Sequence, residues 1–187
     1  MDQQDAQTDD DLMAEFQGGS VAAFEELVRR YQARLTVYAE TMTADGPAAD
    51  DVAQETFVRV FEQRREYVAS GHFRAWIYKI ARNLCVDRFR EPALFSLDVD
   101  VPLLLWSGLK RTEDVSEQLR KLEESEQLAR LGREARRLPG PMRDVVLLRY
   151  YHGLKTREIA DVIGCPVGTV KSRLHYALER LQRMVSR

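Results

Sequence analysis

The chain has 187 residues, of which 44% are hydrophobic and 31% are charged, and it carries 10 Gly and 6 Pro. These proportions exclude a disordered, a collagen-like and a low-complexity chain. No apolar run approaches the roughly 20 residues of a membrane-spanning helix, and the acidic residues 1–11 do not form a secretory signal. Cys85 and Cys165 provide neither a disulfide framework nor metal-ligand spacing, so we expect a cytoplasmic protein with reduced thiols and no cofactor.

The formal net charge is -2, but the charges are unevenly distributed along the chain. Residues 63–90 hold 7 basic and 2 acidic side chains, and residues 132–187 hold 12 and 5, whereas segments 1–62 and 91–131 are acidic. Two basic segments separated by acidic ones indicate two surfaces for a polyanion, with the remaining surface kept away from it. Two solvated basic helix faces are the alternative that charge alone leaves open.

Apolar residues recur at three- and four-residue steps through the first 90 residues, which predicts one helical domain. Glycine, proline and aspartate mark the expected ends of its helices. A break is expected at 18–20, with Ser20 as N-cap of the next helix, and a turn at 45–47 precedes a helix that starts at or next to Asp50. After a second break at 70–71, a helix is expected from Phe73 to about residue 90, where Pro92 stops it.

Residues 92–112 have a different character, because Pro92, Pro102 and Gly108 break any helix while nine large apolar residues lie between Leu94 and Trp106. This segment is too apolar for a free linker. Either it packs on a domain or it docks on a partner, and we expect it to pack between the two domains and to hold the free chain compact. Amphipathic periodicity resumes at residue 113, so the second domain is expected to span 113–187.

The segment 156–174 predicts a helix-turn-helix. Thr156 is expected to cap the first helix, Gly164 to end it with a positive φ, and Pro166 to start the second helix near its first turn. The three helices of this region are expected at about 142–151, 156–163 and 166–185, after a turn at 139–141.

Projected at about 100° per residue, the last helix separates an apolar face from a polar one. The apolar face, expected to be buried, carries Val170, Leu174, Ala177, Leu178 and Leu181. Short polar groups near the helix start, with cations beside them, are typical of a recognition helix in the major groove of DNA. A helical hairpin with a polar outer face is the alternative. The candidate DNA contacts are Gly168, Thr169, Lys171, Ser172, Arg173 and Tyr176.

Aromatic and basic residues interleave over residues 64–90. Single-stranded nucleic acid is bound by this combination, through base stacking and phosphate neutralisation. The apolar residues of the segment share one helix face and favour a core, whereas Arg74, Lys79, Arg82, Asn83 and Arg90 are candidates for the outside.

The whole chain resembles a bacterial RNA polymerase sigma factor of the extracytoplasmic-function group of the sigma-70 family. Four segments carry the resemblance in the family's order and spacing, namely residues 12–31, 50–61, 73–88 and 138–174. The chain is therefore expected to be all-α, with two small helical domains at 1–91 and 113–187, the apolar linker 92–112 between them, and the helix-turn-helix in the second domain.

The resemblance implies a transcription initiation factor that binds core RNA polymerase and directs it to promoters by reading −10 and −35 elements, without covalent catalysis. It implies docking on the clamp helices of the largest polymerase subunit and on the flap of the second-largest. Promoter DNA is a second partner, an anti-sigma factor is a candidate third, and no membrane is involved. The −35 contacts are the recognition-helix residues above.

Two residue sets in the first domain follow from the resemblance. A base extruded from the −10 element is expected to enter a pocket in the loop near 65–73. The core-polymerase set is Asp51, Gln54, Glu55, Phe57 and Phe61, and the −10 set is Arg65, Tyr67, Ser70, Phe73, Trp76, Lys79, Arg82 and Asn83. The alternative for Phe57 and Phe61 is that they belong only to the core of this domain.

Three other classes of protein explain the sequence less completely than a sigma factor does. A stand-alone helix-turn-helix regulator that binds duplex DNA without polymerase would explain 113–187 but leave 50–90 without a role. An enzyme is not expected, because the sequence shows no nucleophile elbow, phosphate-binding loop or metal-ligand cluster. A helical adaptor would not explain residues 168–173. Tyr176 stands where relatives commonly carry Arg, which predicts one missing phosphate contact.

Overall fold

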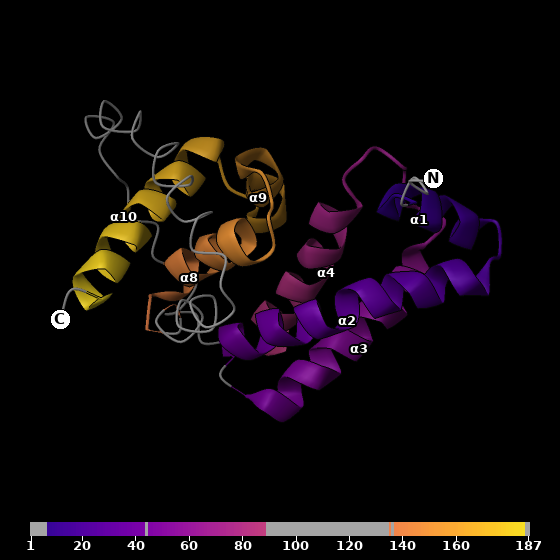
Figure 1. Ribbon diagram of the computed structural model, residues 1–187, viewed down its shortest axis with the longest axis horizontal. Helices are drawn as coiled ribbons and strands as arrows, with labels where there is room; N and C mark the ends of the chain where they lie inside the picture. Colours follow the sequence, from indigo (N-terminus) through magenta and orange to yellow (C-terminus); the bar gives the residue numbers. More distant parts are fainter. Residues whose placement is uncertain (1–6, 44, 89–134, 136, 186–187) are drawn as a thin grey trace, which may run out of the picture. The chain divides into compact units, whose positions relative to one another are not determined.

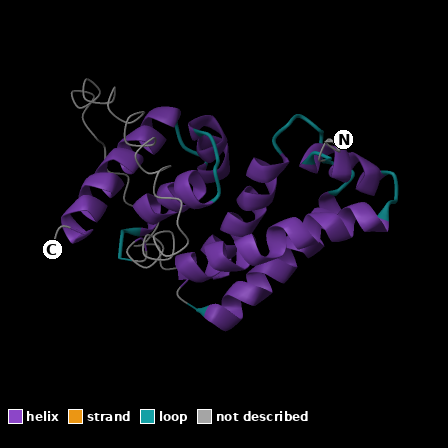
Figure 2. Ribbon diagram, in the orientation of Figure 1, coloured by secondary structure: helices purple, strands orange, loops and turns teal. Residues whose placement is uncertain are grey.

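The computed structural model describes residues 7–43, 45–88, 135 and 137–185, and these residues form helices and loops without a strand (Figure 1 and Figure 2). They belong to two units, which divide the chain after residue 89. The predicted all-α fold is confirmed. Among the described helices, none is both long and apolar enough to cross a membrane. The predicted linker 92–112 and the periodicity expected from residue 113 to 134 lie outside the described residues.

The first unit is built on the long antiparallel pair of α2 (Val21–Thr43) and α3 (Gly46–Gln63), which lie side by side in Figure 1. The shorter helices α1 (Asp9–Gln17) and α4 (Phe73–Arg88) pack against this pair. The apolar stripes of all four helices meet in one core, which leaves the polar faces outward. Its fully buried side chains include Met13, Leu27, Leu35, Tyr38, Val60, Phe73, Ile77 and Tyr78.

The predicted start of α2 is confirmed, whereas the start of α3 differs from the prediction. Ser20 caps α2 as expected, since its Oγ accepts a hydrogen bond from the Ala23 N–H at 3.3 Å. The predicted turn at 45–47 is instead the N-cap and first turn of α3, because the Asp45 carboxylate accepts from the Ala48 N–H at 3.2 Å. A proline in the first helical turn costs no hydrogen bond, so the Asp-Gly-Pro sequence starts a helix there. The expected start at Asp50 was therefore wrong.

The second unit consists of α8 (Gly140–Val146), the π-helical turn η2 (Leu147–Tyr151), α9 (Thr156–Ile163) and α10 (Val167–Val185). The turn predicted at 139–141 is again a helix start with proline in the first turn. Thr156 is the first residue of α9 and not its cap. The Glu158 carboxylate accepts a hydrogen bond from the Lys155 N–H at 2.5 Å and satisfies that end of the helix.

The turn between α9 and α10 follows the prediction. Gly164 ends α9 with a φ of 73°, in the left-handed region that glycine enters without steric cost. On α9 the buried residues are Ile159, Ala160 and Val162, whereas Ile163 is half-buried. On α10 Leu178 is also half-buried, whereas the rest of the predicted face is buried, namely Val170, Leu174, Ala177 and Leu181.

Two glycines of the first unit differ in backbone conformation, and this difference should decide how alanine at each position changes stability. Gly71, in the loop between α3 and α4, has a φ of 76°, whereas Gly46 lies in the first turn of α3. A Cβ at either position would meet no neighbouring atom within 4 Å. The two positions therefore differ in backbone conformation and not in space.

We predict that Gly71→Ala lowers the free energy of unfolding by about 1 kcal/mol, because an L residue is strained at this φ. Gly46→Ala should raise it by about 0.5 kcal/mol, because alanine restricts the unfolded chain and fits the helix. Urea unfolding followed by circular dichroism measures both. Changes of the same sign in the free energy of unfolding of the two variants would contradict the claim that backbone conformation distinguishes Gly71 from Gly46.

Candidate protein and nucleic-acid interfaces

The polar residues predicted to bind polymerase lie together on the outer side of α3. Asp51 and Gln54 are exposed and Glu55 is half-buried. The Asp51 carboxylate pairs with the Arg88 guanidinium at 3.3 Å, and the Glu55 carboxylate pairs with Arg59 at 2.9 Å. Both pairs are exposed to solvent, so their contribution to stability is small and a partner can replace them at little cost.

The two phenylalanines predicted for the same interface behave differently. Phe57 is 8% exposed, and its ring packs edge-on against Phe24 at 6.2 Å between centroids. Its ring belongs to the core of the unit, so the prediction that it offers apolar area to a partner is corrected. Phe61 is 49% exposed, with the Arg64 guanidinium 4.3 Å from its ring centroid. An exposed ring held by a cation is a suitable anchor for a protein partner.

Val58 was not among the residues predicted to bind polymerase. It is 48% exposed and lies one helical turn after Gln54 and one turn before Phe61. Its spacing of four and three residues from these positions was the available signal. We define the α3 face as Asp51, Gln54, Glu55, Val58 and Phe61.

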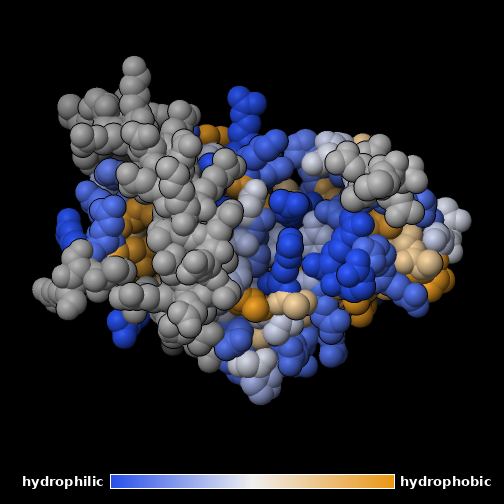
Figure 3. Space-filling model, viewed as in Figure 1, coloured by the Kyte–Doolittle hydropathy of each residue, from blue (hydrophilic) through white to orange (hydrophobic). Residues whose placement is uncertain are grey.

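Figure 3 shows apolar surface at the end of the first unit where α1 ends and α2 begins, and the exposed Val21 lies in that region.

The loop between α3 and α4, residues 64–72, carries several of the predicted −10 contacts. Tyr67 is 8% exposed, and its hydroxyl donates a hydrogen bond to Asp10 Oδ1 at 2.6 Å. Burial and this hydrogen bond raise the pKa of Tyr67 above the ordinary value of a phenol, so the hydroxyl remains a donor. Tyr67 is therefore an anchor of the loop, and its ring is not exposed for the predicted −10 contact. Arg65 and Ser70 are exposed as predicted.

Phe73, which was also among the predicted −10 contacts, lies in the core, as the shared apolar face of its helix favoured. It is 1% exposed, and its ring packs against Tyr31 at 5.5 Å and Tyr67 at 5.8 Å between centroids. A ring enclosed in this way has no face left for a base. Trp76 is half-buried, with its ring centroid 4.8 Å from that of Tyr67.

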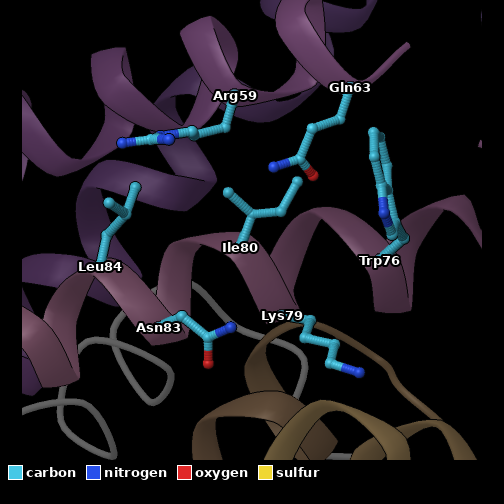
Figure 4. Close-up of a pocket in the computed structure, with 7 residues that line it drawn as sticks. All are labelled: Arg59, Gln63, Trp76, Lys79, Ile80, Asn83 and Leu84. Carbon is cyan, nitrogen blue, oxygen red and sulfur yellow. The ribbon is translucent and has the colours of Figure 1, made fainter. Parts of the chain in front are cut away.

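A groove of about 320 Å³ runs between α3 and α4 and contains three of the predicted −10 residues (Figure 4). In this view Gln63 extends from α3 toward Ile80, Arg59 extends toward the end of the groove at Leu84, and Trp76 stands at the opposite end. Its lining combines an aromatic ring, two amides and two cations, which is the chemistry that holds single-stranded nucleic acid. The lining residues are Arg59, Gln63, Trp76, Lys79, Ile80, Asn83 and Leu84.

Lys79 and Asn83 are exposed, and in Figure 4 their side chains point away from α3, along the open side of α4. Arg82 lies between them in sequence, is half-buried and does not line the groove. The structure thus brings Trp76, Lys79 and Asn83 together and leaves Arg82 at the side.

The predicted −35 residues lie in the first half of α10. The Ser172 hydroxyl donates to the Gly168 carbonyl at 3.1 Å, and Arg173 Nη1 lies 3.9 Å from Cys165 Sγ in the turn before the helix. These contacts orient both side chains without burying them. Lys171 is exposed, and the others are half-buried, namely Gly168, Thr169, Ser172, Arg173 and Tyr176.

Two models of known protein families match the chain. The model of Sigma-70 region 2 matches residues 27–93, which include most of α2 and all of α3 and α4. The model of Sigma-70 region 4 matches residues 128–181, which include α8, η2, α9 and most of α10. The groove, the loop and the recognition helix all lie within these matches.

The chain is also similar to whole proteins along nearly its full length. It is 31% identical over 182 residues to the RNA polymerase sigma-H factor of Pseudomonas aeruginosa, covering 94% of this chain and 92% of that protein. It is 30% identical to the ECF RNA polymerase sigma factor SigW of Bacillus subtilis, covering 89% and 91%. The solved structure of CnrH in complex with the cytosolic domain of CnrY matches with a TM-score of 0.68 at 26% identity, covering 95% and 97%. The chain belongs to the extracytoplasmic-function group of the sigma-70 family of RNA polymerase sigma factors.

Proposed function

We propose that the two units of this sigma factor divide the recognition of a promoter between them. The protein is a transcription initiation factor that binds core RNA polymerase and directs it to specific promoters. In this division, the first unit docks on the polymerase and captures the −10 element as a single strand, and the second unit reads the duplex −35 element. The observation that carries the proposal is that the α3 face shares no residue with the groove or its adjacent loop, although Glu55 pairs with the groove residue Arg59 and Phe61 contacts Arg64 of the loop.

The α3 face supports docking on a helical partner. Its acidic and amide groups suit a partner helix that carries basic and amide side chains, as the clamp helices of the largest polymerase subunit would. The exposed Val58 and Phe61 supply apolar area that becomes desolvated in the complex. Such apolar anchors, surrounded by polar groups, carry most of the energy of protein interfaces. The second unit would dock on the flap of the second-largest subunit.

The groove and the loop support capture of a melted strand. Opening a base step costs a few kcal/mol, which stacking on Trp76 and contacts to the exposed Lys79 and Asn83 would offset. Arg65 and Ser70 lie on the loop that would receive the extruded base. The proposed mechanism uses binding energy alone and includes no covalent step.

The start of α10 supports reading of the −35 duplex. A recognition helix contacts base edges near its N-terminus and phosphates at its sides. The exposed Lys171 suits a phosphate, whereas Arg173 can present two donors to a guanine edge.

This function places the protein with the polymerase in the cytoplasm. A stand-alone regulator is not favoured, because the match to Sigma-70 region 2 gives residues 27–93 a role. An anti-sigma factor is a further expected partner, and one that covered the α3 face would block docking on the polymerase. Transcription in vitro with core polymerase tests the function as a whole, since promoter-specific transcripts should require this protein.

The docking prediction compares two exposed valines of the first unit. Val58→Asp should weaken the affinity for core polymerase by about tenfold or more, because it places a charge in the desolvated part of the interface. Val68→Asp is the matched control, since Val68 is 77% exposed in the loop and outside the α3 face. Fluorescence anisotropy with labelled sigma factor measures both affinities. Equal affinities for the two variants would refute docking through the α3 face.

The −35 prediction separates base reading from phosphate binding. Arg173→Ala should cost roughly 1–3 kcal/mol and relax the preference at one base position, because a bidentate contact is lost. Lys171→Ala should weaken binding to all sequences alike and lower the salt slope by about one. Holoenzyme binding to −35 variants over a salt series distinguishes the two effects. Unchanged affinity, slope and preference in both variants would show that α10 does not enter the groove in this way.

A further inference from the structure

Helix α1 is joined to the loop 64–72 by five hydrogen bonds, although these segments are far apart in the sequence. Figure 1 shows the connection between α3 and α4 passing beside α1. Three of the bonds end on Asp10, in the first turn of α1, and two begin on Gln17, at its last residue. The family resemblance assigned no role to either residue.

Asp10 holds the second half of the loop through one oxygen. Its Oδ1 accepts from the Tyr67 hydroxyl at 2.6 Å and from the backbone N–H groups of Ser70 and Gly71, both at 3.1 Å. Two successive backbone N–H groups therefore converge on one oxygen, as they do in backbone anion-binding sites. Hydrogen bonds to a carboxylate are stronger than those between neutral groups.

Gln17 holds the first half of the loop. Its Nε2 donates to the Arg64 carbonyl at 2.6 Å and to the Tyr67 carbonyl at 2.7 Å. The Tyr67 ring is buried between these two attachments. Arg65, Val68 and Ser70 remain exposed on the outer side of the loop. The loop is thus fixed from inside by α1 and keeps its outer side available.

We infer that α1 is the positioning element of the loop that reads the −10 element, and that Asp10 and Gln17 are its positioning residues. The inference rests on the proposed function, which gives this loop the extruded base. A loop that is already ordered in the free protein loses less conformational entropy when it binds. It also cannot rearrange around a wrong base, so these hydrogen bonds increase the discrimination between bases.

The test uses the full chain with core polymerase. The probe is a premelted duplex whose single-stranded non-template segment is randomised, and sequencing of the bound fraction gives the enrichment of each base at each position. We expect Asp10→Ala and Gln17→Ala each to lower the enrichment of the preferred base by about fivefold at the same one or two adjacent positions. Affinity for core polymerase and binding to the −35 duplex should not change.

Asp11→Ala is the matched control. It removes the same charge from the same helix turn, and the Asp11 carboxylate belongs to the capping box of α1, where it accepts from the Thr8 backbone N–H at 3.1 Å. Its enrichment profile should equal that of the wild type. Asp10→Asn keeps an acceptor oxygen and should restore most of the preference. Tyr67→Phe removes only the hydroxyl, so it tests the same attachment if Asp10→Ala does not fold.

Arg65→Ala and Ser70→Ala separate this inference from the proposed function. If these two variants change the profile while the Asp10, Gln17 and Tyr67 variants do not, the loop reads the base without help from α1, and the inference is overturned. It is also overturned if Asp11→Ala flattens the profile as strongly as Asp10→Ala. If neither loop variant has an effect, the loop does not read the base, and that part of the proposed function fails together with the inference.

Discussion

The packing of Phe73 against Tyr31 and Tyr67 is the interaction on which the surfaces of the first unit depend. Phe73 is the first residue of α4, and its buried ring joins that helix to α2 and to the loop before it. The rings of Tyr67, Phe73 and Trp76 all contact one another, with centroids 4.8 to 5.9 Å apart, so the loop and Trp76 are fixed together with this ring. Edge-to-face contacts of this kind restrict ring orientation as well as burying area. The position of the groove thus follows from the core.

The division between core and surface decided which predictions of the site could succeed from the sequence. Interleaved aromatic and basic residues predicted a nucleic-acid surface, and the cations Arg65 and Lys79 are exposed. Burial separates the aromatic residues, since Phe73 and Tyr67 complete the core while Trp76 borders the groove. An aromatic residue recurs at the same helical spacing whether its ring lies in the core or at the groove. Only packing against a neighbouring helix distinguishes a core ring from one available to a base.

Helix existence was predictable here, whereas helix starts and tertiary attachments were not. Proline with glycine or aspartate marks both a turn and the first turn of a helix, which explains the errors at Asp45 and Pro141. The link between Asp10 and Tyr67 joins residues 57 positions apart, and no local pattern encodes it. Val58 had a detectable spacing on α3, but its exposure depends on where α2 packs.

The central claim is that polymerase and the melted −10 strand occupy separate surfaces of the first unit. Sedimentation of a mixture of the full chain, core polymerase and a premelted promoter, with each component labelled by its own fluorophore, tests this claim most directly. Separate surfaces predict one species that contains all three components, with sigma factor and DNA in equal amounts. Displacement of the DNA from the sigma factor by core polymerase, in proportion to the polymerase added, would show that the two ligands share one surface and would contradict the account.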